Sequence, residues 1–120
     1  MKKLGIDLDG CVDESPEFFR ILTQMWPGDV IVITFREDKA KAIADLNKYQ
    51  IRFTEVVLVK SLTSKWESIV EHDVGFYIDD QPEALKWVPS TVAVMLFRNE
   101  GNFDVAQRKW MFSEQTAKLV

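Results

Sequence analysis

The sequence predicts an α/β fold, a three-layer sandwich around a mainly parallel sheet of five strands. Short apolar runs rich in Val and Ile recur along the chain, and helix-like stretches separate them. Strands that are apolar without alternation are typical of parallel sheets, whose two faces are both covered. Regular alternation of strands and helices favours right-handed crossovers, which makes the sandwich Rossmann-like. The strands are expected at Leu4–Leu8, Val30–Thr34, Glu55–Val59, Gly75–Ile78 and Val92–Phe97.

Helix signals lie between these runs. Ser15-Pro16-Glu17 offers an N-cap, a proline at the first helical position and an early acid. Thr63 or Ser64 is a second candidate N-cap, directly before an apolar pattern of helical spacing. The helices are expected at residues 15–26, 37–48, 63–70, 82–87 and 105–118.

Composition and charge limit the function classes. A chain of 120 residues, 47% hydrophobic and 28% charged, predicts one globular domain over residues 1–120. The net charge of −4 argues against general binding to nucleic acid or to anionic lipid. A single cysteine, no apolar run of bilayer length and no signal-peptide pattern predict a cytoplasmic protein without a membrane partner.

Polar residues follow the carboxyl ends of the predicted strands, which is where open parallel sheets form their active sites. Carboxylates follow two strands, a hydroxyl ends another, and lysines come after a fourth. Because these ends meet at one edge of the sheet, we expect the side chains to share one site. They are Asp7 and Asp9, Thr34, Lys60 or Lys65, and Asp79 with Asp80.

This set of residue types indicates phosphoryl transfer. On a continuing strand Asp7 and Asp9 point to the same face, and Gly10 then permits a sharp turn. Several carboxylates at short range need a cation, and an all-oxygen site beside a phosphate suits Mg²⁺. Asp7 would then attack phosphorus to give an aspartyl-phosphate, while Thr34 and a lysine hold the phosphoryl oxygens. Asp9 would protonate the leaving oxygen and later activate water.

Four segments in order resemble the motifs of the haloacid dehalogenase superfamily, over roughly residues 4–102. They are Asp7-Leu8-Asp9-Gly10-Cys11-Val12, Val30-Ile31-Val32-Ile33-Thr34, Lys65 or Lys60, and Phe76-Tyr77-Ile78-Asp79-Asp80. Three stretches are similar to the nucleotidase-like (5′-nucleotidase) branch of this superfamily. They are Ile33-Thr34-Phe35-Arg36-Glu37, Tyr77–Glu83, and Val94–Phe97 with Asn99 and Asn102.

The resemblance implies a Mg²⁺-dependent phosphatase with an assigned ligand set. Mg²⁺ would bind the Asp7 carboxylate, the Asp9 backbone carbonyl and the fourth-motif acids, with Asp80 in direct contact and Asp79 acting through water. Lys65 is favoured over Lys60, because family lysines tend to open the helix that follows. Arg36 is a candidate for binding phosphate or substrate, although exposure to solvent is an equal alternative.

Substrate and assembly stay open at this stage. The stretch from Val12 to Val30 holds one short helix, so we expect no cap domain, and a small phosphorylated substrate such as a nucleotide is the first candidate. Alternatives are a polynucleotide-end or phosphoprotein phosphatase, and a non-catalytic module that binds phosphate or Mg²⁺. Trp110, Met111 and Phe112 either cover the sheet or form a contact in a homo-oligomer.

Overall fold

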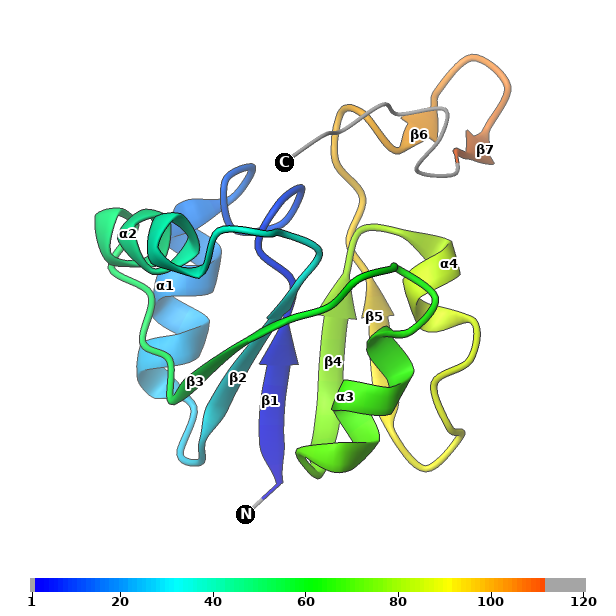
Figure 1. The fold of residues 1–120 in the computed structure, drawn as a ribbon. Helices are drawn as coiled ribbons and strands as arrows, with labels where there is room; N and C mark the ends of the chain where they lie inside the picture. Colours follow the sequence, from blue (N-terminus) through cyan, green and yellow to red (C-terminus); the bar gives the residue numbers. More distant parts are fainter. Residues whose placement is uncertain (1, 112–120) are drawn as a thin grey trace.

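The computed structural model describes residues 2–111 of the chain. Within this part, the chain forms a five-stranded parallel sheet with the strand order β3-β2-β1-β4-β5 (Figure 1). The predicted α/β sandwich is confirmed. Its strands are β1 (Lys3–Ile6), β2 (Val30–Thr34), β3 (Glu55–Leu58), β4 (Val74–Asp79) and β5 (Ala93–Leu96).

Helices cover both faces of this sheet and make the sandwich three layers thick (Figure 1). The alternation along β2 shows why its run is continuously apolar, because Val30 and Val32 face one layer while Ile31 and Ile33 face the other. Phe19 from the first helix packs on the Val30 side, and Ile69 packs on the Ile31 side. The helices are α1 (Pro16–Met25), α2 (Lys39–Lys48), α3 (Lys65–Glu71) and α4 (Pro82–Leu85).

The helix expected at residues 105–118 is wrong over its described part. Residues 105–108 form a turn, and β7 (Lys109–Trp110) pairs antiparallel with β6 (Phe103–Asp104). The turn is built by Arg108, at a positive φ of 58°, and by the Asp104 carboxylate, which accepts a hydrogen bond from the Gln107 amide at 3.0 Å. Phe103 and Trp110 then pack edge to face, with ring centroids 5.0 Å apart. The rest of that expected helix, residues 112–118, lies outside the described residues.

The strand order places a topological switch point between β1 and β4. The chain moves from β1 to β2 and β3 on one side, then returns to β4 on the other side of β1 (Figure 1). Ligand crevices of open parallel sheets form at such a point, outside the carboxyl ends of the strands. Among the described helices, none is long and apolar enough to cross a bilayer.

Candidate active site

The site is built at the carboxyl ends of β1 and β4, the two strands that flank the switch point. β1 ends at Ile6, so Asp7 is the first residue beyond it, and β4 ends with Asp79 itself. The Asp7 amide donates to the Ile78 carbonyl at 3.0 Å, which continues the pairing of the two strands by one residue. Asp7, Asp79 and Asp80 are all buried, although each carries a carboxylate.

Lys65 joins two of these acids. Its Nζ atom donates to Asp7 Oδ1 at 2.9 Å and to Asp79 Oδ2 at 2.7 Å, and its side chain is fully buried. Asp79 Oδ2 also accepts from the Tyr77 hydroxyl at 2.6 Å, and Asp79 Oδ1 accepts from the Gln81 amide at 3.0 Å. Both oxygens of Asp79 are therefore engaged, and this carboxylate serves to hold the lysine.

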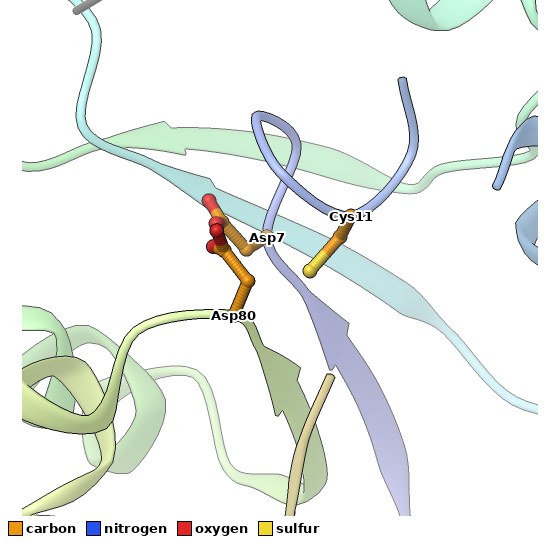
Figure 2. Close-up of side chains that lie close together, drawn as sticks. All are labelled: Asp7, Cys11 and Asp80. Carbon is orange, nitrogen blue, oxygen red and sulfur yellow. The ribbon is translucent and has the colours of Figure 1, made fainter. Parts of the chain in front are cut away.

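Asp80 differs from Asp79 in having an oxygen to spare. Its Oδ2 atom accepts from Asn99 at 3.1 Å and from Gln81 at 3.2 Å, whereas its buried Oδ1 has no hydrogen-bond partner among residues 2–111. Figure 2 shows the carboxylates of Asp7 and Asp80 close together, with the Cys11 sulfur beside them; one ligand atom from each lies within 4.8 Å of the others. A pair of carboxylates with a free oxygen fits a hard cation such as Mg²⁺.

The protonation of this cluster reflects its burial. Burial and the neighbouring charge of Asp79 raise the pKa of Asp7 well above its ordinary value. Burial likewise raises the pKa of Asp80 to about 6. Burial on its own lowers the pKa of Lys65, but Asp7 and Asp79 outweigh it and hold that pKa above the ordinary value. Lys65 thus stays charged, but its single positive charge does not balance the carboxylates of Asp7, Asp79 and Asp80. A bound divalent cation would supply the missing positive charge.

Cys11 offers a third donor in this group, of a different chemical kind. Burial, followed by the charge of Asp7, raises the pKa of its thiol well above the ordinary value. A protonated thiol is a poor metal ligand, and thiolates suit soft cations. The side chain is fully buried within the α1–α2 core layer, so packing accounts for it.

Thr34 ends β2, the other neighbour of β1, and is fully buried. Its Oγ1 atom has no hydrogen-bond partner within the described part of the chain. A buried hydroxyl without a partner is uncommon and calls for an explanation such as a bound group. Its position at the strand end is the one that the sequence predicted for a phosphoryl-binding hydroxyl.

Gly10 keeps the first loop close to Asp80. Its φ is +86°, which favours glycine, and a Cβ atom placed there would lie 2.0 Å from Asp80 Oδ2. The loop is fixed on both sides, because the Gly10 amide donates to Asp13 Oδ1 at 2.7 Å and its carbonyl accepts from Asn99 Nδ2 at 2.7 Å. The sequence prediction of a sharp turn at Gly10 is confirmed.

Two asparagines that sequence reasoning did not assign to the site complete it. Asn99 bridges the Gly10 carbonyl and Asp80, and Asn102 donates to the Asp80 carbonyl at 2.6 Å and to the Phe97 carbonyl at 2.7 Å. Asn102 Oδ1 also accepts from the Asn99 amide at 2.8 Å. Both residues follow β5, so the strand-end rule applied to the fifth strand would have found them.

Asp9 does not join Asp7, contrary to the expectation that both point to one face. The strand ends at Ile6, and the chain turns from residue 8 onward, so the two-residue repeat of a strand no longer applies. The Asp9 carboxylate instead accepts two hydrogen bonds from Arg36, from Nε at 2.8 Å and from Nη2 at 2.7 Å. The structure thus gathers Asp7, Thr34, Lys65, Asp79 and Asp80 around the strand ends and leaves the Asp9 carboxylate on Arg36.

The structure distinguishes the two candidate lysines by their position. Lys60 is exposed, whereas Lys65 opens α3 and extends into the acidic cluster. Lys65 is therefore the lysine that faces Asp7, the preference stated from the sequence. No family model, curated protein or solved structure matches this chain.

Proposed function

We propose that the chain is a Mg²⁺-dependent phosphohydrolase that works through Asp7. One observation carries the proposal: two buried atoms without partners, Asp80 Oδ1 and Thr34 Oγ1, accompany Asp7 and the buried cation of Lys65. The first is an acceptor suited to a metal, and the second is a hydroxyl suited to a phosphoryl oxygen. The carboxylates of Asp7 and Asp80 would hold Mg²⁺ together with the Asp9 backbone carbonyl, and the ion would neutralise phosphate charge.

The reaction that follows uses the chain's own residues. An oxygen of Asp7 forms a bond to phosphorus while the bond to the leaving oxygen breaks, which gives an aspartyl-phosphate. Lys65 and Thr34 hold the phosphoryl oxygens as their charge redistributes. In its protonated form, Asp9 gives a proton to the leaving oxygen, and the ionised Asp9 then takes a proton from the attacking water. The water oxygen bonds to phosphorus as the bond between Asp7 and phosphorus breaks, so inorganic phosphate leaves and both aspartates are restored.

A second candidate function has one observation in its favour. Asp9 is engaged on both oxygens by Arg36, as is expected of a residue with a structural role. In a non-catalytic module that binds phosphate or Mg²⁺, Asp9 would have no need to leave Arg36. The two candidates differ in turnover and agree in binding, so both properties should be measured.

The proposal is tested by a phosphatase screen over p-nitrophenyl phosphate, nucleotides, sugar phosphates and phosphorylated polynucleotide ends. We expect hydrolysis with Mg²⁺ and loss of hydrolysis with EDTA, because under-compensated carboxylates repel a phosphate dianion unless a cation is present. Mg²⁺-dependent binding of phosphate without turnover of any substrate would favour the non-catalytic module. Turnover that is undiminished in EDTA would contradict the metal-dependent mechanism.

Asp80→Asn is expected to remove the stabilisation that Mg²⁺ gives to the wild type. A ligand that binds the folded state alone stabilises by about 2.7 kcal/mol at a hundredfold excess over Kd. Asn keeps the shape of the side chain and its bonds with Asn99 and Gln81, but it is a weak ligand for a hard cation. Thermal unfolding with and without saturating Mg²⁺ measures the difference.

Without metal, the Asp80→Asn variant should be more stable than the wild type above about pH 6. The pKa of Asp80 is raised to about 6 in the folded state, against ~3.9 for an unfolded aspartate, so the folded chain holds this proton more tightly. Metal-free wild type therefore loses stability as the pH rises from about 4 to about 6, a loss that the Asn variant does not share. Two results together would contradict the metal site at Asp80. Wild type and variant would have the same melting temperature at about pH 7.5 as well as at about pH 4, and Mg²⁺ would still stabilise the variant.

A further inference from the structure

Arg36 lies between two carboxylates that come from different segments. Its Nε and Nη2 atoms donate to the two oxygens of Asp9, in the loop after β1. Its remaining Nη1 donates to Asp45 Oδ2 at 2.8 Å, and Asp45 lies within α2. The guanidinium therefore has a bidentate partner and a second, single partner at the same time.

The burial of the three side chains is unequal. The Arg36 side chain is only 8% exposed, while those of Asp9 and Asp45 are 24% and 26% exposed. A guanidinium so far removed from water needs a carboxylate partner, because an unpaired buried charge is strongly destabilising. Asp9 or Asp45 alone can be that partner. The presence of one carboxylate therefore lowers the free-energy cost of separating the other from Arg36.

Asp9 has to leave Arg36 if it is to act as acid and base. Both of its oxygens accept hydrogen bonds from guanidinium donors, so neither is free to face a leaving oxygen or a water molecule. Its departure would leave Arg36 with Asp45, at the 2.8 Å contact that already exists. Without Asp45, the same departure would strand a nearly buried cation.

We propose that Asp45 is a positioning residue that acts through Arg36: it keeps the guanidinium compensated while Asp9 moves between Arg36 and the reacting atoms. This inference rests on the proposed phosphohydrolase function. Arg36, predicted from the sequence as a phosphate or substrate contact, then has a different task, which is to hold the acid/base residue when no leaving group is present.

The first test measures unfolding alone and needs no activity. If Asp9 and Asp45 are interchangeable partners of Arg36, Asp9→Asn and Asp45→Asn should each lower Tm slightly. The double variant should lie about 4 °C or more below the sum of the two single shifts. Lys41→Ala is the matched control, because Lys41 is an exposed neighbour 4.0 Å from Asp45. Additive shifts in Tm would overturn the proposal whether or not the protein is a phosphatase.

The second test measures kcat/KM, which reports the phosphorylating step, for two leaving groups. Asp45→Asn should lower kcat/KM about tenfold for ribose 5-phosphate, whose alkoxide needs a proton, and leave p-nitrophenyl phosphate nearly unchanged. Asp45→Glu should recover most of the loss, and Asp45→Asn should have no further effect in an Arg36→Gln background. Equal losses for both substrates, or an effect that persists without Arg36, would reduce Asp45 to a structural role. If wild type hydrolyses neither substrate while the Tm shifts are non-additive, the proposed function and the catalytic role of Asp45 both fail, and the shared pairing of Arg36 stands.

Discussion

Asp7→Asn is expected to lower the turnover of every phosphate ester by at least about 10⁴-fold, because it removes the oxygen anion that attacks phosphorus in the proposed mechanism. Asn has nearly the same shape and can still accept a hydrogen bond from Lys65, which lies 2.9 Å from Asp7 Oδ1 in the wild type. The loss should therefore be chemical, with the fold retained. Steady-state kinetics with p-nitrophenyl phosphate, alongside circular dichroism, measures both.

The matched control is Asp29→Asn, the same substitution at an exposed residue directly before β2. Asp29 lies at the amino end of that strand, away from the cluster at the carboxyl ends. Its replacement should leave turnover within about twofold of wild type, since isolated surface changes have small effects. Comparable losses in the two variants would show that Asp7 has no special chemical role.

Lys65→Met is expected to reduce turnover by about 10³-fold and to destabilise the metal-free protein by about 3–5 kcal/mol. Its ammonium is fully buried between Asp7 and Asp79, at 2.9 and 2.7 Å, so its removal leaves two like charges without compensation. Methionine fills much of the same space, which separates the loss of charge from the loss of volume. Kinetics and urea denaturation measure the two effects.

Lys60→Met is the control for Lys65, because it makes the same substitution at an exposed lysine that precedes α3. We expect its stability within about 0.5 kcal/mol of wild type and its turnover nearly unchanged. The reverse ranking of the two variants would place the phosphate-binding lysine at Lys60.

The fold could be predicted because its signal is redundant along the chain. β2 reads Val30-Ile31-Val32-Ile33, and each face of the sheet takes every second residue of that run, so no other element type fits it well. The C-terminal hairpin carried no such signal. A local turn around Arg108 and one aromatic contact of Trp110 with Phe103 decide it, and both are tertiary or conformational details that apolar spacing does not report.

The site could be predicted to the extent that it follows from topology. Asp7, Thr34 and Asp80 are brought together because parallel strands end at one edge, and this needs no knowledge of side-chain conformation. The partner of Asp9 could not be predicted in the same way. It depends on where β1 ends and on the path of the loop after Thr34, which together put Arg36 within hydrogen-bond distance.

The cluster also implies an opposition between the stability of the metal-free protein and the proposed function. Burial raises the pKa values of Asp7 and Asp80, and this shift measures how strongly the folded chain resists their ionisation. A neutral residue at either position would relieve the repulsion in the metal-free protein. A divalent cation bound at the proposed site would compensate both acids and remove this penalty.

Trapping the covalent intermediate on Asp7 tests the central claim most directly. Asp9→Asn should still accept the phosphoryl group from p-nitrophenyl phosphate, whose leaving group needs no proton, but it should hydrolyse the adduct slowly. The variant is mixed with this substrate and Mg²⁺, quenched with hydroxylamine and digested for mass spectrometry. We predict a hydroxamate on Asp7, in the peptide that contains Ile6-Asp7-Leu8. Turnover by the wild type without any adduct on Asp7 in the variant, or with the adduct on another residue, would contradict the account.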